Sequence, residues 1–567
     1  MGSLSPVSSF IVALIAFCTV GASGATLDDW RSRTIYQVIT DRFSRTDGST
    51  TAPCDVVNGR YCGGSWKGIT NRLDYIQGMN FDAIWISPVV EQLPQVTIDG
   101  DAHMGYWAQD IYNLNSNFGT ADDLHELIAE VHRRGMYLML DIVVNHMAYA
   151  GPASQVDYSV FHPFDDERYF HSYCPIYGYT NQTEVEVCWM GSSAVSLVDL
   201  RTEDRDVRDM WSTWITQMIS NYSIDGLRID TAVNVEPDFF ASFVRAAGVF
   251  ATGETMFGDN SIVCRWADSI GSILNYPIYY PLMRAFGSTT GNLNDLVTTI
   301  YTTRGNCEDT TTFGTFSENH DVARFTELTN DTAQAKNILA FTIMFDGIPI
   351  IYQGQEQHMA GTISPHTNRS PLWSTGFDTE AELYKHISTL VLARKLFVLA
   401  EENYTKSETD VIYQDYHSMV LRKGVNDTQV ITVLNNAGES TGDFDLEILA
   451  HGLAFGTQVM EVLTCTNLTV DDLGVLKVPM GQGLPKVMYP TEFMANSGLC
   501  GMGEPLPKPT TTVTASPPAP PTSTTSGKPD DSGAVRSCNA QFSIPILAMT
   551  LSILVASSGV FAYFLET

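Results

Sequence analysis

The segments that decide the fold are GLRID (226–230), FATGE (250–254) and FSENHD (316–321). Each ends in an acid that follows a run of apolar and β-branched residues, and the acids are Asp230, Glu254 and Asp321. This pattern is typical of a buried strand that carries a carboxylate at its C-terminal end. The C-terminal strand ends of a (β/α)8 barrel meet on its catalytic face, so we expect the three acids to converge there. Three converging acids suit the cleavage of a glycosidic bond.

Strand-like and helix-like stretches alternate between residues 25 and 400, which predicts a parallel barrel or a doubly wound sheet. The strand candidates are TIYQVIT (34–40), FDAIWIS (81–87), YLMLDIVV (137–144), GLRID (226–230), GVFATGE (248–254), FGTFSEN (313–319) and IPIIYQG (348–354). Between them, the segment 121–135 carries apolar residues at helical spacing and ends at Gly135. Residues 25–400 are therefore expected to form one α/β catalytic domain.

Two regions break this alternation. Residues 145–200 are too long for a simple crossover and are rich in Tyr, Phe, Asp and Gly, which predicts a subdomain inserted on the catalytic side of the barrel. Residues 401–500 contain short alternating segments with turn residues between them, such as SMVLRKG (418–424) and QVITVLNN (429–436). That pattern predicts a separate C-terminal antiparallel β-sandwich.

The chain is strongly acidic. Its 567 residues include 64 acidic and 32 basic side chains, which give a net charge of −32. Binding to nucleic acid requires a basic surface, so we expect no nucleic-acid partner. The charge suits a neutral substrate and work outside the cell, although solubility alone would explain it equally well.

The first 24 residues are typical of a secretory signal peptide. Residues 10–20 form a short apolar core, and the small residues 21–24 follow it. The apolar run is too short to span a membrane. We therefore expect cleavage after Gly24 and entry into the secretory pathway.

The C-terminus has the composition of a stalk followed by an anchor signal. Residues 501–531 are rich in Pro, Thr and Ser, a composition that forms no core. Within residues 532–567, small residues at 532–534 precede a short polar spacer and an apolar tail, which is the pattern of a GPI-attachment signal. A transmembrane helix is the alternative, because the tail is long enough to span a bilayer, but no basic cluster follows it. We expect a GPI lipid anchor that holds the protein at the plasma membrane or cell wall.

Cysteine usage agrees with export. Two of the ten cysteines lie in the signal peptide and the C-terminal tail, and eight remain. Their wide spread, without any CxxC, argues against a zinc cluster. Spacing leaves the connectivity open, but neighbours in sequence suggest the pairs Cys54–Cys62, Cys174–Cys188, Cys264–Cys307 and Cys465–Cys500. N-glycosylation sequons, which fit the same route, occur at Asn181, Asn221, Asn330, Asn368, Asn403, Asn426 and Asn467.

The motifs DIVVNHM (141–147), GLRIDT (226–231), TGET (252–255) and ENHD (318–321), in this order, resemble the four signature regions of the α-amylase family, glycoside hydrolase family 13. Longer stretches, such as DGIPIIYQGQEQH (346–358), are similar to fungal secreted α-amylases. The resemblance covers about residues 29–500. It implies a (β/α)8 TIM barrel with a B subdomain inserted after strand 3 and a C-terminal antiparallel β-sandwich. The anchor signal is like that of GPI-anchored fungal amylase-like enzymes, some of which are glucanotransferases.

The family implies a retaining mechanism for the three acids. Asp230 matches the nucleophile that attacks the sugar carbon C1, and Glu254 matches the acid/base that protonates the leaving oxygen. Asp321 matches the acid that holds substrate hydroxyls and stabilises the oxocarbenium-like state. The physical chemistry of retention asks for the same arrangement, with the two reacting carboxyl groups ~5–5.5 Å apart.

Other residues match the substrate-binding positions of the family. His146 and His320 resemble its pair of imidazoles that bind hydroxyls of the cleaved sugar, and Tyr106 resembles its aromatic platform. Arg228 lies two residues before Asp230, on the same side of the strand, where a cation lowers the pKa of a carboxylate. The expected substrate-binding set is Tyr106, Trp107, His146, Arg228, His320 and Arg369. The sequence does not decide whether Trp107 contacts the sugar or packs in the core.

Calcium is the metal that the resemblance implies. The side chains of Asn145, Glu186 and Asp199 match the family's ligands between barrel and insertion, and the main-chain carbonyl of Asn234 matches a fourth. Hard oxygen donors of this kind suit Ca²⁺. The alternative is that these residues are ordinary surface groups.

The chain departs from the fungal pattern at two places near the acids. After GLRIDT it has Val233 and Asn234 where a Lys-His pair is usual, and the stretch SPHTNR (364–369) lacks an Asp usually found before Arg369. Neither change touches the three acids, so we expect intact chemistry with altered specificity. One hypothesis is that an apolar Val233 dries the acceptor side and favours a sugar acceptor over water.

These observations predict a monomeric cell-surface α-amylase that cuts internal α-1,4-glucosidic bonds and serves cell-wall α-glucan metabolism. A 4-α-glucanotransferase is the alternative, because it shares the covalent intermediate and differs only in the attacking group. A non-catalytic glucan-binding protein is a third reading, against which the three intact acids argue. The expected partner in each case is an α-glucan or a maltooligosaccharide.

Overall fold

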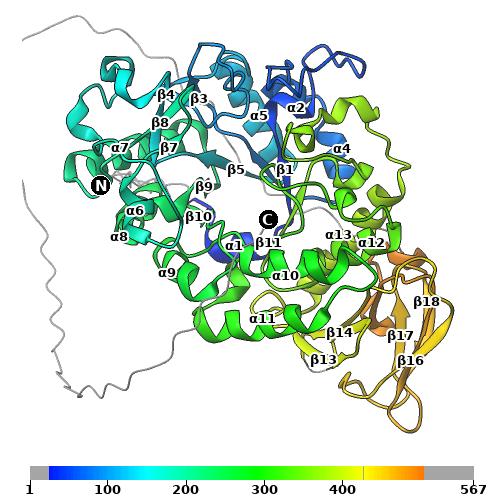
Figure 1. Ribbon diagram of the computed structural model, residues 1–567. Coiled ribbons are helices and arrows are strands. Elements are labelled where there is room, and N and C mark those ends of the chain that lie inside the picture. Colours follow the sequence, from blue (N-terminus) through cyan, green and yellow to red (C-terminus); the bar gives the residue numbers. More distant parts are fainter. Residues whose placement is uncertain (1–23, 426, 504–567) are drawn as a thin grey trace, which may run out of the picture. The chain divides into compact units, whose positions relative to one another are not determined.

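Short parallel strands form the centre of the protein in the computed structural model, which describes residues 24–425 and 427–503 (Figure 1). In spatial order the sheet contains β10 (Phe250–Gly253), β9 (Gly226–Ile229), β5 (Tyr137–Ile142), β2 (Ala83–Ile86), β1 (Ile35–Val38), β12 (Ile348–Tyr352) and β11 (Gly314–Phe316). Nearly every residue of these strands is buried, as expected for a parallel sheet that is covered on both faces. All seven strands lie within the strand candidates taken from the sequence.

A two-residue segment closes the sheet. Gly253 of β10 pairs in parallel with Ile273, and Leu274 pairs in parallel with Gly314 of β11. The pairs join the two edge strands, so the sheet becomes the predicted (β/α)8 barrel. The sequence did not reveal this segment, because two residues carry no periodic pattern. Buried side chains that fill the barrel include Trp85, Met139, Phe250, Phe316 and Ile350.

Helices cover the outside of the barrel. In α5 (Ala121–Arg133), Thr120 and Asp123 form a capping box, and one face is buried, as the spacing of its apolar residues predicted. The residues of that face are Leu124, Leu127, Ile128 and Val131. The other helices are α1 (Leu27–Arg31), α2 (Thr40–Phe43), α3 (Trp66–Thr70), α4 (Leu73–Gly78), α6 (Gln182–Val187), α7 (Arg205–Tyr222), α8 (Pro237–Ala247), α9 (Asn260–Ile270), α10 (Tyr276–Phe286), α11 (Leu293–Asn306), α12 (Thr332–Met344) and α13 (Glu382–Ala400).

The long stretch after β5 folds as a small antiparallel sheet. It contains β6 (His146–Ala150), β8 (Val195–Asp199) and β7 (Met190–Gly191), in that spatial order. β6 begins four residues after β5 ends, so the insertion starts at the C-terminal end of a barrel strand. A second hairpin, β3 (Val90–Gln92) with β4 (Ala108–Leu114), follows β2 at the same kind of position. Both insertions therefore border the face that the three acids occupy.

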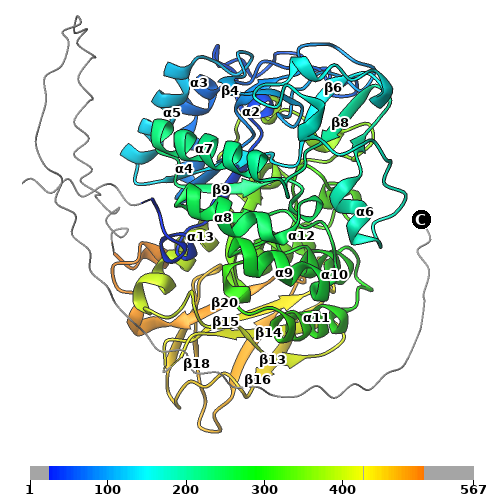
Figure 2. The ribbon, with the colours of Figure 1, turned by 90° about the vertical axis from the view of Figure 1, so that its left-hand side faces the viewer.

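The C-terminal strands form two antiparallel layers (Figure 2). One sheet contains, in spatial order, β13 (Asp410–Gln414), β14 (Ser418–Lys423), β15 (Val430–Asn435), β20 (Lys486–Pro490), β17 (Gln458–Glu461) and β18 (Thr466–Thr469). The other pairs β16 (Phe444–Ile448) with β19 (Leu476–Met480). Val420 and Val433 of the first sheet share a core with Leu446 and Val478 of the second. The predicted C-terminal antiparallel β-domain is confirmed.

Four disulfides connect neighbours in sequence. The structure contains Cys54–Cys62, Cys174–Cys188, Cys264–Cys307 and Cys465–Cys500, which are the four predicted pairs. The first two lie in loops on the catalytic side, and the third ties α9 to the end of α11.

The predicted signal peptide apart from Gly24, the predicted stalk beyond residue 503 and the predicted anchor signal lie outside the described residues, as does the sequon at Asn426. Within residues 24–425 and 427–503, the helices lack the combination of length and apolar character that crossing a membrane requires.

A buried ion cluster joins the C-terminal domain to the barrel. Asp346 precedes β12. Its carboxylate forms ion pairs with Lys423 Nζ of β14, at 2.5 Å, and with Arg304 Nη2 of α11, at 2.6 Å. The backbone nitrogen and hydroxyl of Thr409, in the linker before β13, bond the same carboxylate. Asp346 and Lys423 are almost fully buried, so neither charge has water as an alternative partner.

We expect Asp346→Asn to lower the free energy of unfolding by about 3–5 kcal/mol, because it leaves Lys423 and Arg304 buried without their counter-charge. Denaturant unfolding measures the effect. Lys406→Ala is the matched control, since Lys406 pairs with Asp28 on the surface and both side chains are half exposed or more. That control should cost no more than about 1 kcal/mol. Equal losses in the two variants would contradict the assignment.

The same cluster predicts a pH dependence. Burial alone would raise the pKa of Asp346, but Lys423 and Arg304 more than offset it and hold the pKa below its ordinary value. A carboxylate with a lowered pKa stabilises the fold above its unfolded-state pKa of about 4, and this contribution disappears as the pH falls through the folded-state pKa. The stability difference between wild type and Asp346→Asn should therefore be full at neutral pH and shrink in acid. A difference independent of pH would argue against the ion cluster.

Candidate active site

The three acids line one cavity at the C-terminal ends of the barrel strands. Asp230 directly follows β9, Glu254 directly follows β10, and Asp321 lies in the loop after β11. The cavity has a volume of about 510 Å³. Its wall also contains five of the expected substrate-binding residues, namely Tyr106, Trp107, His146, His320 and Arg369. The structure thus brings together residues that are up to 263 positions apart in the chain, from 106 to 369.

Arg228 lies beneath this cavity and does not line it. Its side chain is fully buried. Nη1 donates to Asp230 Oδ1 at 2.8 Å and to Asp141 Oδ1 at 2.9 Å, and Nη2 lies 2.8 Å from Glu254 Oε1. The expectation that Arg228 belongs to the substrate-binding set is therefore corrected. Its whole charge is directed at three carboxylates, so it acts on them and not on a sugar.

The electrostatics of the three acids differ. Burial raises the pKa of Asp230 well above its ordinary value, the nearby Glu254 adds to this, and Arg228 opposes it. Burial would also raise the pKa of Asp321, but His320 and Arg369 outweigh burial and hold that pKa below its ordinary value. These neighbours therefore favour the ionised form of Asp321, whereas the ionisation of Asp230 depends on Arg228.

A hydrogen-bond chain links His320 to the acids. Gln37 Nε2 lies 2.8 Å from His320 Nδ1, and the other ring nitrogen, Nε2, faces the acids. That nitrogen lies 2.8 Å from Asp321 Oδ2 and 2.8 Å from the hydroxyl of Tyr106. The Tyr106 hydroxyl in turn donates to Asp141 Oδ2 at 2.7 Å. The rings of Tyr106 and His320 are parallel within 4° and their centroids are 5.4 Å apart. Tyr106, which the sequence predicted as an aromatic platform for a sugar ring, is therefore also hydrogen-bonded to the groups around the acids.

Arg369 and its neighbour hold the turn that carries Asp321. Arg369 Nε donates to the His320 carbonyl at 2.8 Å, and Nη2 donates to Asp321 Oδ1 at 2.9 Å. Asn368 Nδ2 donates to the carbonyls of His320 and Val322, at 2.8 and 2.9 Å. Asn368 is fully buried, so its sequon cannot be glycosylated in the folded protein. The remaining sequon asparagines within the described residues are exposed, namely Asn181, Asn221, Asn330, Asn403 and Asn467.

His146 is a neutral wall residue. Burial lowers its pKa to about 4. Its Nε2 lies 3.1 Å from the Tyr106 carbonyl and must donate, because a carbonyl only accepts, and its Nδ1 lies 3.4 Å from the amide nitrogen of Asn145. Both ring nitrogens thus have protein partners, and sugar binding by His146 stays a prediction. Trp107 lines the cavity and is held through its backbone nitrogen by Gln92 at 2.7 Å.

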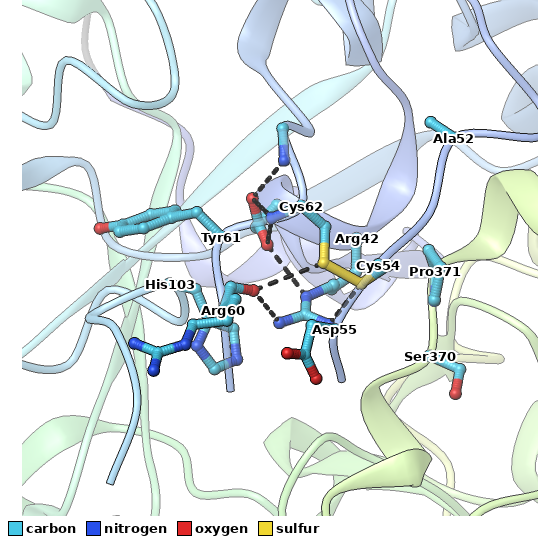
Figure 3. Close-up of a disulfide and its surroundings, with 12 residues drawn as sticks. Arg42, Ala52, Cys54, Asp55, Arg60, Tyr61, Cys62, His103, Ser370 and Pro371 are labelled. Carbon is cyan, nitrogen blue, oxygen red and sulfur yellow. Dashed lines mark hydrogen bonds and ion pairs between the residues drawn. A yellow bond between two sulfur atoms is a disulfide. The ribbon is translucent and has the colours of Figure 1, made fainter. Parts of the chain in front are cut away.

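The loop closed by Cys54–Cys62 supports one wall of the cavity (Figure 3). Arg42 donates to Cys54 Sγ and to the Arg60 carbonyl, as the dashed lines in Figure 3 show. Arg60 pairs with Asp101 at 3.1 Å, and Asp101 lines the catalytic cavity. The disulfide therefore braces the segment that continues to Tyr106.

The four predicted calcium ligands fall into two pairs in the structure. β6 and β8 pair side by side with His146 opposite Asp199, so Asn145, which directly precedes His146, lies close to Asp199. Glu186 is joined to the segment 232–234 through Gln182, whose Nε2 bonds both Glu186 Oε1 and the Val233 carbonyl at 2.8 Å. Within residues 24–425 and 427–503, no hydrogen bond or ion pair joins the side chains of one pair to those of the other.

The donor set fits a hard cation. Asp199 Oδ1 is buried and has no hydrogen-bond partner, which leaves one charged oxygen for a further ligand. Burial raises the pKa of Asp199 to about 7, although His171 lowers it, and a cation would restore the charge. Within the described residues, no three His, Cys, Asp or Glu side chains cluster around a metal position. The predicted set differs from such a cluster, because it includes one amide and one main-chain carbonyl.

Val233 and Asn234 are not in the cavity wall. Val233 is only 5% exposed and belongs to the main hydrophobic core, and Asn234 donates its amide to the Val185 carbonyl at 3.1 Å. The hypothesis that Val233 dries the acceptor side is therefore wrong in its mechanism. The side chains near Glu254 that do line the cavity are Thr231 and Met256.

Sequence reasoning missed the residues under the site. Asp141 is 1% exposed and receives hydrogen bonds from Arg228, Tyr106 and Trp85 Nε1. An acid inside the apolar run YLMLDIVV was the available signal, because a buried charge requires a partner. Gln37, within TIYQVIT, carried the same kind of signal.

Comparison with known protein families shows which family this chain belongs to. Residues 37–382 match the family described as alpha amylase, catalytic domain, and residues 411–506 match alpha-amylase, domain C. The chain belongs to the α-amylase family. It is therefore a glycoside hydrolase of that family and an enzyme.

Known members of this family match most of the chain. The α-amylase 1 of Lipomyces kononenkoae is 49% identical over 477 residues, which are 84% of this chain and 76% of that protein. The α-amylase 2 of Schwanniomyces occidentalis is 46% identical over 480 residues, 85% of this chain and 94% of that protein. A solved structure of an α-amylase from Malbranchea cinnamomea has a TM-score of 0.82 and 48% identity, and it covers 84% of this chain and all of its own.

The contacts of Arg228 predict the effect of removing its charge. Arg228→Gln takes away the group that lowers the pKa of Asp230, so the carboxylate needs a higher pH to ionise. We expect the acid limb of the kcat/KM profile on starch to move to higher pH and kcat to fall by about 100-fold or more. The control is Arg284→Gln, which removes a surface partner of Asp295 and should leave the profile unchanged. An unshifted acid limb in Arg228→Gln would contradict the role.

Proposed function

We propose that the protein is an α-amylase that hydrolyses internal α-1,4-glucosidic bonds of an α-glucan with retention of configuration. One observation carries the proposal. A single buried guanidinium, that of Arg228, contacts Asp230 and Glu254 at 2.8 Å each, and both acids line the cavity that also holds Asp321. A shared cation keeps two carboxyl groups close together, as a retaining pair needs and an inverting pair, with water between its members, does not.

The roles follow from the environment of each acid. Asp230, ionised with the help of Arg228, attacks C1 while Glu254 gives its proton to the leaving oxygen, so the glycosidic bond breaks and a glycosyl ester forms. Glu254 then takes a proton from water, the water oxygen bonds to C1, and Asp230 is released as a carboxylate. Asp321, held as an anion by His320 and Arg369, is placed to bond sugar hydroxyls and to stabilise the positive charge that develops on the ring.

Calcium is part of the proposal. Asn145, Asp199, Glu186 and the carbonyl of Asn234 would hold it, and its charge would fasten the inserted subdomain to the barrel beside Asp230. The unpartnered, buried Asp199 Oδ1 supports this assignment.

The location proposed is the cell surface, with a role in cell-wall α-glucan metabolism. The pattern of residues 501–567 supports a GPI anchor, and the N-terminal pattern supports export. The four disulfides fit an oxidising compartment.

Removing the acid/base separates an enzyme from a binding protein. Glu254→Gln keeps the shape of the side chain but cannot carry the transferable proton, so we expect turnover to fall at least about 1,000-fold, while binding of maltoheptaose is retained. Hydrolysis assays and calorimetry measure the two quantities. Asp238→Asn, at an exposed acid in α8, is the control and should keep full turnover. Unchanged turnover in Glu254→Gln would remove Glu254 from the mechanism.

Product lengths decide between hydrolysis and glucan transfer. With maltoheptaose, we expect only shorter products and an equal growth of reducing ends, because water attacks the glycosyl ester. Products longer than the substrate with little new reducing end would show a 4-α-glucanotransferase. No product of any length would favour the glucan-binding reading. Time-resolved chromatography with a reducing-end assay distinguishes the three outcomes.

Chelation tests the calcium assignment. We expect EDTA to lower the Tm of the enzyme and Ca²⁺, but not Mg²⁺, to restore it, because the donors are numerous and irregular. Asp199→Asn should have a lower Tm without chelator and a smaller response to it. The same response to EDTA in wild type and Asp199→Asn would place any calcium elsewhere.

A further inference from the structure

The proposed acid/base, Glu254, has a buried partner that does not line the cavity. The hydroxyl of Tyr276 donates to Glu254 Oε1 at 3.4 Å. This distance is long for an O–H···O pair, as catalytic hydrogen bonds often are before a substrate binds. Tyr276 is fully buried and does not line the cavity, so it acts on a substrate only through Glu254.

The closure of the barrel places Tyr276. The segment 273–274 pairs with β10 on one side and with β11 on the other. Tyr276 is the first residue of α10 and follows this segment by two positions. Glu254 directly follows β10, and Asn319 lies in the loop after β11. The tyrosine therefore lies between two residues that come from the neighbouring strand ends.

Asn319 determines where the tyrosine hydroxyl directs its proton. Asn319 Oδ1 accepts the backbone N–H of Asp321 at 2.8 Å, which leaves Nδ2 to face Tyr276. An amide nitrogen of this kind only donates, and it lies 2.8 Å from the hydroxyl oxygen of Tyr276. That oxygen is thus the acceptor for Asn319, and its own proton is available to Glu254.

The two carboxyl oxygens of Glu254 have different surroundings. Oε1 faces two donors, the Tyr276 hydroxyl and Arg228 Nη2, of which the second lies at 2.8 Å. Oε2 accepts one backbone N–H, that of Thr231, at 3.1 Å. A proton on Oε1 would meet the hydrogens of its two donors. The proton that Glu254 transfers is therefore carried by Oε2.

The packing of the tyrosine ring does not explain its hydroxyl. The ring of Tyr276 packs edge-on against Phe316, with centroids 4.9 Å apart, among the residues that fill the barrel. A phenylalanine ring would fill the same space. A buried hydroxyl costs free energy unless it is hydrogen-bonded, and both partners of this hydroxyl belong to loops that carry the proposed catalytic acids.

We propose that Tyr276 is a positioning residue for the acid/base. Its hydroxyl, oriented by Asn319, holds Oε1 of Glu254 so that the proton on Oε2 stays directed at the leaving oxygen. The inference rests on the proposed function, since it assumes that Glu254 is the acid.

The same hydrogen bond favours the transition state over the ground state. As the Oε2 proton passes to the leaving oxygen and the bond from C1 to that oxygen breaks, Glu254 becomes a carboxylate. A hydrogen bond to a charged oxygen is stronger than one to a neutral oxygen. The Tyr276 hydroxyl therefore stabilises Glu254 most while the proton is leaving, which raises kcat.

Two substrates with different leaving groups test this in the purified secreted enzyme. Maltoheptaose must release a sugar oxygen, which needs the proton of Glu254, whereas α-maltosyl fluoride releases fluoride, which leaves without a proton. In Tyr276→Phe we expect kcat/KM to fall about 10-fold on maltoheptaose and to change less than about 2-fold on the fluoride. The ratio of the two constants does not depend on the amount of folded enzyme, so a less stable variant still decides the question.

Asn319→Ala tests the orienting step. Without its amide donor the Tyr276 hydroxyl is free to turn, so the ratio should move in the same direction as in Tyr276→Phe. Any effect on Asp321 concerns both substrates alike and cancels in the ratio. The double variant should have the ratio of Tyr276→Phe alone, because Asn319 acts on Glu254 through that hydroxyl. A ratio in the double variant that adds the two single effects would contradict this step.

The matched control is Tyr279→Phe. Tyr279 lies in the same helix, with its ring centroid 5.9 Å from that of Tyr276, and its hydroxyl makes no hydrogen bond to another residue within 24–425 and 427–503. Both of its constants should equal those of wild type. The proposal is overturned if Tyr276→Phe leaves the ratio unchanged or lowers both constants equally. Failure of the proposed function looks different, because Glu254→Gln itself would then show no preference for the fluoride.

Discussion

One buried cation organises the catalytic face of this protein. Arg228 has no access to water and three carboxylates within 3 Å, those of Asp141, Asp230 and Glu254. Without it, burial of several like charges in one place would force protons onto some of them. A protonated Asp230 cannot attack a sugar. The arginine therefore decides whether Asp230, the proposed nucleophile, is ionised, although it does not line the cavity.

The strand register of the barrel places that cation. β9 pairs with β5 so that Arg228 lies directly opposite Asp141, and it pairs with β10 so that Arg228 lies opposite Thr252. Alternate residues of a strand share a face, so the register puts Arg228 on the face shared by Asp230 and Glu254. A slip by one residue would turn the guanidinium outward and leave the acids unpaired. The register of these three strands is thus a requirement of the chemistry as well as of packing.

The sequence predicted those features that depend on neighbouring residues in the chain. Runs such as GVFATGE show a strand by composition and an acid by position, so the seven main strands and the convergence of the acids could be predicted. Contacts between residues on different strands of the barrel leave no such signal in the neighbouring sequence. Nothing near Gln37 indicates that its amide bonds the ring of His320, and nothing near Ile273 indicates that two residues close the sheet.

Specificity in this fold depends on which side chains reach the cavity, and spacing from a catalytic acid is a poor guide to that. Val233 lies three residues from Asp230 yet is buried in the main hydrophobic core. Met190 lies far from every acid in sequence yet lines the catalytic cavity, because β7 pairs with β8 in the inserted sheet. The edge of the inserted subdomain also carries Asp199 and Glu186, the proposed calcium ligands, and its loop is closed by the disulfide Cys174–Cys188.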